Sequence, residues 1–154
     1  MIIRKMQPVE FDVTVNLFGY YRDEAIESIP SIEAEYDEDS VIETIRHYAT
    51  QWDYCWFNAY DNTRPVGFIA GYVTTCPWNR DKIIANIGFI YLLDSHKNMD
   101  NFRLLLKHFE EWALTVGAKQ ITAGDIGINI ERSQKLYEHF GFKPVLFTVK
   151  ELTE

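Results

Sequence analysis

The sequence predicts a single domain of the α/β (α+β) class, with helices and strands in the order β-α-α-β-β-β-α-β-α-β. Three observations support this prediction. The length of 154 residues suits one domain. Short β-rich runs alternate with segments of helical periodicity. A β-rich run, Ile83–Asp94, passes directly into a strongly amphipathic segment that ends at Gly117. We therefore expect one domain over residues 1–154.

The composition is that of a globular protein. It is 47% hydrophobic, 15% aromatic and 25% charged, which is typical of a packed core rather than a disordered or fibrous chain. Cys55 and Cys76 form no CxxC pair, so we expect two reduced, buried thiols. The N-terminal residues lack a signal-peptide core, and no apolar run reaches the roughly 18 residues that span a bilayer. We expect a soluble cytoplasmic protein with no membrane partner.

The first third of the chain predicts one strand and two helices. Ile2–Met6 is β-prone, and a proline two residues later suits the first turn of a helix over Val9–Ala25. Ser40 and Glu43 form a capping box, in which each side chain satisfies an orphan N–H group. A second helix is therefore expected from residue 41 to about residue 51.

A β-hairpin is predicted next. Tyr54–Tyr60 and Val66–Thr75 are rich in aromatic and β-branched residues, and the residues between them, 61–65, have turn chemistry. A second turn at residues 77–81 leads into the strand that ends at Asp94.

The last third predicts a helix, a strand, a second helix and a final strand. Apolar residues of the first helix recur at i, i+3, i+4, i+7, i+10 and i+11, namely Phe102, Leu105, Leu106, Phe109, Trp112 and Ala113. Gly117 ends it. Gln120–Ala123 reads as a strand, and Asn129 is the expected N-cap of a helix over Ile130–Phe140, which Gly141 ends. Phe142–Leu152 is the predicted last strand.

The junction between the strand ending at Asp94 and the next helix is the predicted ligand site. The first backbone N–H groups of a helix have no intrahelical partner, and the helix dipole favours an anion there.

Several function classes lack the residues that they need. No Cys/His cluster has metal-ligand spacing, and no Gly-x-Ser-x-Gly motif occurs, so neither a metal cofactor nor a serine hydrolase is expected. The net charge of −8 opposes nucleic-acid binding, because phosphate backbones require clustered Lys and Arg.

The second half of the chain resembles the GNAT superfamily of acyl-CoA-dependent N-acyltransferases. The resemblance rests on Leu105-Leu106, on Glu110–Ala113 with Gly117–Lys119, and above all on Leu136–Pro144, which is similar to the family's LYEKLGFKP ending. It implies a mixed, mostly antiparallel central sheet, flanked by about four helices and splayed where acyl-CoA enters. Small acidic proteins of this kind are frequent in bacteriophage genomes, so a phage origin and a location in the host cytoplasm are further expectations.

The resemblance implies a CoA-binding loop at the strand-to-helix junction. It aligns the family's Arg/Gln-x-x-Gly-x-Gly/Ala loop with Lys97, Asn98, Met99, Asp100, Asn101 and Phe102. The glycine positions then hold Asn98, Asp100 and Phe102. Glycine lets a backbone approach phosphate closely, so this loop is expected to bind CoA less tightly than the family's, with Lys97 and Arg103 supplying charge. We expect Asp100 to cap the helix rather than to bind the ligand.

The resemblance also implies residues for the acyl group and for the chemistry. Backbone N–H groups from Ile90 to Leu92 would polarise the thioester carbonyl, and Asn129 partly replaces an asparagine of the family. Tyr137 aligns with the family tyrosine that protonates the departing thiolate. The alternative is that Tyr137 only packs under the last strand.

The position of the family's catalytic glutamate is occupied by Asn86, which cannot accept a proton at neutral pH. A water relay or Asp125, at the end of the next strand, would have to act as the base.

Two functions remain open at this point. The first is an N-acyltransferase that uses acetyl-CoA or another acyl-CoA to acylate a small-molecule or protein amine. The alternative is a catalytically inactive binding or structural module of the same fold, favoured by Asn86 and by the missing glycines. The oligomeric state is open, a homodimer included.

The resemblance implies that the segment joining the first two helices borders the acceptor side of the cleft. In this segment, nine carboxylates between Asp23 and Glu43 are opposed by Arg22 alone, and a negative field raises the local concentration of cations. A cationic acceptor such as a polyamine or a lysine-rich protein is one interpretation, and a solvated acidic loop is the other.

Overall fold

The computed structural model describes residues 1–124, 130–146 and 148–152, and these residues build one five-stranded sheet. Its order is β1-β2-β3-β4-β5. Neighbours are antiparallel except for β5, which is parallel to β4. The predicted mixed, mostly antiparallel sheet is therefore confirmed. The strands are β1 (Ile2–Lys5), β2 (Tyr54–Asp61), β3 (Arg64–Cys76), β4 (Asn79–Leu92) and β5 (Ala118–Thr122).

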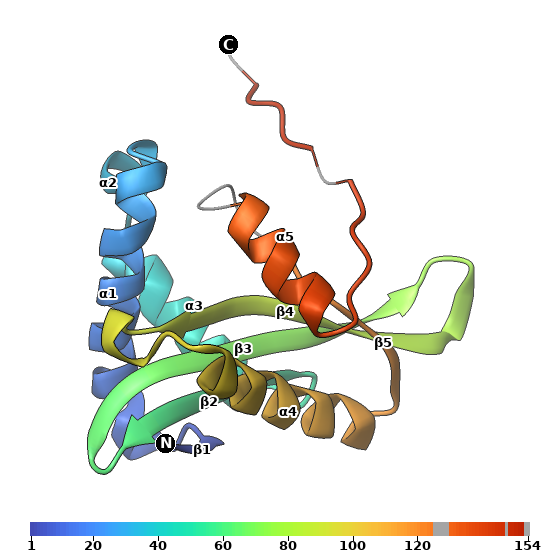
Figure 1. The fold of residues 1–154 in the computed structure, drawn as a ribbon, viewed down its shortest axis with the longest axis horizontal. Coiled ribbons are helices and arrows are strands. Elements are labelled where there is room, and N and C mark those ends of the chain that lie inside the picture. The colour runs from blue at the N-terminus through green and yellow to red at the C-terminus, as the bar shows by residue number, and fades with distance from the viewer. Residues whose placement is uncertain (125–129, 147, 153–154) are drawn as a thin grey trace.

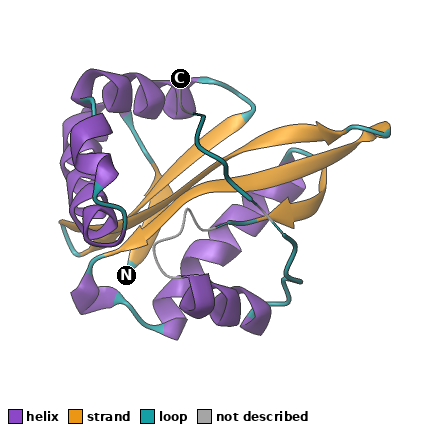
Figure 2. Ribbon diagram, turned by 90° about the horizontal axis from the view of Figure 1, so that it is seen from above, coloured by secondary structure: helices purple, strands orange, loops and turns teal. Residues whose placement is uncertain are grey.

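Helices cover both faces of this sheet (Figures 1 and 2). They are α1 (Phe11–Ser28), α2 (Ser31–Glu35), α3 (Glu38–Thr50), α4 (Met99–Thr115) and α5 (Ile130–His139), with 3₁₀ turns η1 (Pro8–Glu10) and η2 (Asp94–His96). The short helix α2 is an addition to the predicted order, since its five residues carry no helical periodicity that a sequence pattern could reveal. Among the described residues, no helix is long and apolar enough to cross a membrane.

The central strands are buried from both sides, which explains their near-continuous apolar runs. Trp56 and Phe68 pack with Phe18 and Tyr48 under α1 and α3. On the opposite face, Ile69 belongs to a buried cluster with Leu105 and Phe109 of α4, and Leu136 of α5 and Phe140, just after α5, pack against this cluster. Hydrophobic burial of this kind is the main stabilising term in folding.

The second predicted helix begins earlier than the capping box indicated. α3 starts at Glu38, and its N-cap is Asp37, whose carboxylate accepts a hydrogen bond of 3.1 Å from the Ser40 N–H group. The prediction that Ser40 is the cap was wrong. An Asp cap suits the extended backbone of residue 37, and the acidic residues that follow it suit the positive end of the helix dipole.

The last predicted strand, Phe142–Leu152, does not form in the described residues 142–146 and 148–152. This segment leads away from the sheet (Figure 1), and Val145 and Leu146 are 88% and 89% exposed. A β-rich composition gives a strand only where the segment pairs with a neighbouring strand. The glycines before it behave as predicted, since Gly117 and Gly141 have φ of 83° and 89° and end their helices.

Candidate active site

Strands β4 and β5 diverge after a short paired segment. β5 pairs with β4 only between Ile83 and Asn86, so residues 87–92 have no strand partner on that side within the described part of the chain. The Leu93 N–H group donates to the Val66 carbonyl at 2.9 Å. Because successive N–H groups point to opposite sides of a strand, those of Ile90 and Leu92 point to the open edge. Hydrogen-bond donors are thus available there.

A β-bulge lies where the two strands diverge. Ala70 pairs with Phe89 and Gly71 pairs with Ile87, which leaves Gly88 without a counterpart. Bulges bend a strand and increase its twist, and they re-aim the side chains that follow. A Cβ atom at Gly88 would lie 2.6 Å from the Tyr48 hydroxyl. A glycine therefore allows the bulge to pack against the core.

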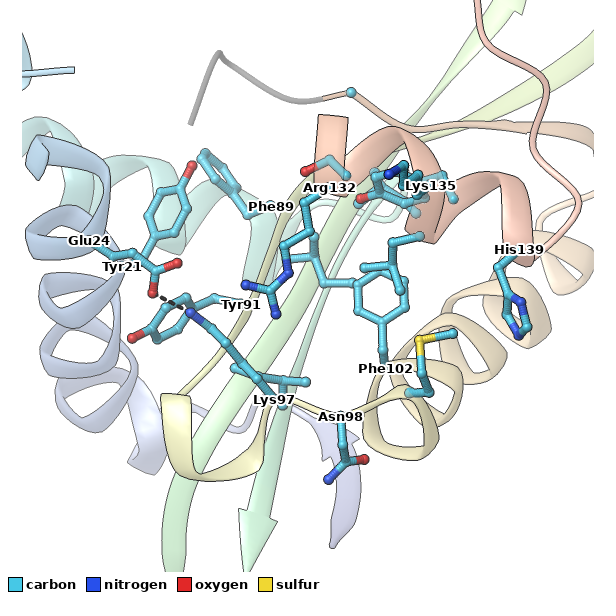
Figure 3. Close-up of a pocket in the computed structure, with 18 of the residues that line it drawn as sticks. Tyr21, Glu24, Phe89, Tyr91, Lys97, Asn98, Phe102, Arg132, Lys135 and His139 are labelled. Atoms are coloured by element: carbon cyan, nitrogen blue, oxygen red, sulfur yellow. Dashed lines mark hydrogen bonds and ion pairs between the residues drawn. The ribbon is translucent and has the colours of Figure 1, made fainter. Parts of the chain in front are cut away.

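A cavity of about 710 Å³ opens over this edge. Its lining comes from the last turns of α1, from residues 87–92 of β4, from the start of α4 and from α5. In Figure 3, Tyr21 and Glu24 of α1 lie on one side of it, and Arg132, Lys135 and His139 of α5 lie on the other. The volume lies within the roughly 300–1,000 Å³ of ligand and cofactor sites, so the cavity can hold a small molecule or part of a cofactor.

The α5 wall of the cavity is basic. Arg132, Lys135 and His139 line it, and in Figure 3 the Arg132 guanidinium points toward the Lys97 side of the space. The sequence patterns assigned none of these three residues to the site. Their spacing of i, i+3 and i+7 on a helix was the signal that could have found them. Such a wall suits an anionic ligand.

The α1 wall is acidic and aromatic. Glu24 and Glu27 line it with Tyr21, whose ring centroid lies 6.2 Å from that of Phe89 and 5.9 Å from that of Tyr91 of β4. Burial raises the pKa of Tyr91 to about 12. This phenol therefore stays neutral at physiological pH.

One ion pair joins the α1 wall to the start of α4. The Lys97 ammonium lies 2.6 Å from Glu24 Oε2 and 2.8 Å from Asp94 Oδ1. Burial alone would lower the pKa of Lys97, but its hydrogen bonds to Asp94 and Glu24 outweigh this effect and raise it. Lys97 therefore carries a positive charge between the two walls.

The predicted CoA loop only partly faces the cavity. Lys97, Asn98, Met99 and Phe102 line it, whereas Asp100 and Asn101 are not among the lining residues. The Asn98 side chain caps α4, accepting from the Asn101 N–H group at 2.8 Å. The expectation that Asp100 is the N-cap was wrong, because Asp100 lies inside the first turn.

The loop keeps an ordinary backbone without glycine. The φ of Asn98 is −150°, and Asn62 is the one non-glycine residue with positive φ in the described part of the chain. The missing glycines therefore impose no backbone strain here. Their replacement places side chains, such as those of Asn98 and Asp100, at positions where the family has glycine.

The Asn86 side chain is part of a hydrogen-bond network between strands. Its amide donates to Thr74 Oγ1 at 3.0 Å and to the Tyr72 carbonyl at 3.3 Å, and its oxygen accepts from Thr122 Oγ1 at 2.6 Å. It thus links β3, β4 and β5 and is not among the cavity residues. Asp125 and Asn129, the other residues implied by the resemblance, lie outside the described residues.

Tyr137 lines the cavity and also packs against its neighbours. Its ring centroid lies 5.8 Å from that of Phe102 and 5.2 Å from that of Phe142. The structure thus places Tyr137 beside the cavity, together with Ile90, Leu92 and the start of α4. Both roles considered for this residue, proton donor and packing residue, fit its position.

An open, mostly antiparallel sheet that splays at β4, with a helix starting beside the gap, defines the fold of the GNAT-type acyltransferases. A model of the Acetyltransferase (GNAT) family matches residues 19–142. The chain belongs to this family.

Solved structures agree with this assignment at the level of the fold. A probable acetyltransferase is 19% identical in sequence and has a TM-score of 0.76, and the match covers 100% of this chain and 98% of that protein's chain. Aminoglycoside N-acetyltransferase AAC(6')-Iy in complex with CoA is 14% identical with a TM-score of 0.74, covering 99% and 93%. Ribosomal-protein-alanine N-acetyltransferase from Brucella melitensis biovar Abortus 2308 is 14% identical with a TM-score of 0.74, covering 99% and 100%. No curated protein sequence matches the chain.

Proposed function

We infer that this protein transfers an acyl group, in the first instance acetyl, from acyl-CoA to an amine. The observation that carries this proposal is a single cavity that joins the open edge of β4 to the start of α4 under a basic wall. Membership of the GNAT acetyltransferase family supports it. A structural relative was solved in complex with CoA, which fits the same co-substrate.

The residues present suit the parts of acyl-CoA. The first N–H groups of α4, at Met99 and Asp100, and the cations Lys97 and Arg132 suit the diphosphate. The N–H groups of Ile90 and Leu92 suit the amide groups and the thioester carbonyl of the acylated arm. Bound acyl-CoA supplies an activated acyl carbon, and the protein holds it next to the amine.

The reaction proposed is a direct transfer. The neutral amine nitrogen attacks the thioester carbon, the carbon–sulfur bond breaks, and its electron pair leaves on sulfur. The new amide nitrogen loses one proton, and the CoA thiolate gains one, for which Tyr137 is the proposed donor. Asn86 has no part in proton transfer, so water or Asp125 is the proposed acceptor. Most of the rate enhancement then comes from positioning.

A second candidate is a GNAT-fold module that binds a partner without catalysis. Asn86 favours it, because the position of the family's glutamate here serves a hydrogen-bond network across three strands. The side chains of Asn98 and Asp100 at glycine positions of the loop also favour it.

A transfer assay separates the two candidates. Acetyl-CoA is incubated with the protein and a panel containing spermidine, a lysine-rich peptide and an aminoglycoside, and both free thiol and acetylated amine are quantified. An enzyme should form free thiol and acetylated amine in equal amounts, in proportion to the protein concentration. Absence of acetylated amine at millimolar acetyl-CoA would overturn the proposal and favour the module.

A further inference from the structure

The cavity is polarised from one wall to the other. Glu24 and Glu27 stand on the α1 side, and Arg132, Lys135 and His139 stand on the α5 side. The proposed acyl-CoA uses the basic wall because its phosphates are anionic. The acidic wall is then left for the other reactant, and carboxylates favour a cation.

An ammonium group already occupies the acidic wall. Lys97 Nζ lies 2.6 Å from Glu24 Oε2 and 5.6 Å from the centroid of the Tyr91 ring. A carboxylate together with an aromatic face is a known way to hold an alkylammonium ion. Lys97 and Glu24 side chains are only 24% and 36% exposed, so this pair is partly shielded from water. The protein's own side chain thus shows what the wall binds.

We propose that the α1 wall is the acceptor subsite and that it selects an amine carrying a second positive charge, the chemical class of diamines and polyamines. The proposal rests on the acyl transfer inferred above. Glu24 and Glu27 hold the distal ammonium, which keeps its proton. Tyr21, Phe89 and Tyr91 contact the methylene chain, and the near amine, in its neutral form, attacks the thioester.

The position of Lys97 couples this subsite to acyl-CoA. Lys97 pairs with Glu24 in the structure, yet it also lies at the start of α4, where the diphosphate is proposed to bind. A diphosphate attracts the Lys97 ammonium, and Glu24 is then left without its cation. Because an unpaired, partly buried carboxylate is costly, the second ammonium of the acceptor is favoured there. Acyl-CoA is therefore expected to bind before the acceptor and to tighten its binding.

The first test compares 1,4-diaminobutane with n-butylamine, which has the same chain and one charge fewer. In the acetyl-CoA assay, kcat/KM for the diamine should exceed that for the monoamine by about five- to fifty-fold. Glu24→Gln and Glu27→Gln should each reduce this ratio. Glu33→Gln, on α2 and outside the cavity, is the matched control and should leave it unchanged. An equal ratio in all four proteins, or an equal loss in Glu33→Gln, would overturn the subsite.

The second test needs no catalysis and so separates this proposal from the proposed function. Binding of 1,4-diaminobutane is measured by calorimetry without acetyl-CoA. Lys97→Met removes the competing ammonium and should tighten binding by at least about three-fold, whereas Glu24→Gln should weaken it. Opposite shifts support the subsite even if no amine is acetylated. Shifts in the same direction, or no shift, would refute it, whatever the transfer assay shows.

Discussion

Replacing Tyr137 by phenylalanine tests the proposed proton donor with little structural change. The ring and its contacts remain, with centroids 5.8 Å from Phe102 and 5.2 Å from Phe142. Only the hydroxyl is lost. The change in the free energy of unfolding is therefore expected to stay within about 1.5 kcal/mol, the net contribution of one hydrogen bond.

The effect on catalysis should be much larger. A positioned general acid contributes about a hundred- to ten-thousand-fold to a rate, because the thiolate otherwise leaves unprotonated. We expect kcat of Tyr137→Phe to be lower by a factor in this range. The dissociation constant of acetyl-CoA should change by less than about two-fold, because its proposed contacts are N–H groups of β4 and α4 and the cations Lys97 and Arg132.

Single-turnover measurements at saturating acetyl-CoA and acceptor give the rate of the chemical step directly. Tyr72→Phe is the matched control, because Tyr72 lies on β3 outside the cavity residues. Its rate should equal that of the wild type. Equal rates in Tyr137→Phe and wild type would refute the general-acid role and leave Tyr137 as a packing residue.

Three further predictions concern stability and the thiols. Burial raises the pKa of Tyr48 and raises that of Cys55 to about 12, so the unfolded chain loses these protons at lower pH than the folded protein, from about pH 9. The stability of the fold should therefore fall as the pH rises from there to 12. Thermal melts should show a less steep fall in Tyr48→Phe. Cys55 is 1% exposed and protonated, so neither it nor the buried Cys76 should react with a thiol reagent at pH 8 until denaturant is added; rapid native labelling would contradict this. Gly71→Ala would overlap the Asn86 carbonyl and the Phe109 ring and should cost about 1–3 kcal/mol in urea unfolding. Gly19→Ala, on helix α1, would place its Cβ in ordinary contact with Arg22, 3.8 Å away, and should stabilise by about 0.5–1 kcal/mol.

Local patterns in the sequence were sufficient where one element decides its own structure. The apolar spacing of α4 predicted which residues face the core, and Phe102, Leu105 and Phe109 are indeed buried. Gly117 ended that helix as predicted, since positive φ is a property of the residue itself. The start of α3 was predicted less well because both Asp37 and Ser40 are good caps, and the sequence alone does not rank them.

Features that depend on distant parts of the chain were not predictable in the same way. The β-rich segment after Gly141 has strand propensity but pairs with no strand in its described residues, and Val145 and Leu146 are exposed. The basic face of α5 becomes meaningful only because α5 lies across the cavity from α1 (Figure 3). Likewise, the pairing of Lys97 with Glu24 joins residues 73 positions apart, and no local pattern indicates such a contact.

A crystal structure with CoA shows directly whether this cavity holds the co-substrate. We expect ordered CoA in the cavity, with its diphosphate at the Met99 end of α4 and within ion-pair distance of Arg132. Its pantetheine arm should lie along Ile90 and Leu92, and Lys97 should have moved from Glu24 toward the phosphates. Crystals soaked in millimolar CoA that show an unchanged Lys97–Glu24 pair and no nucleotide, or CoA bound on another face, would contradict it.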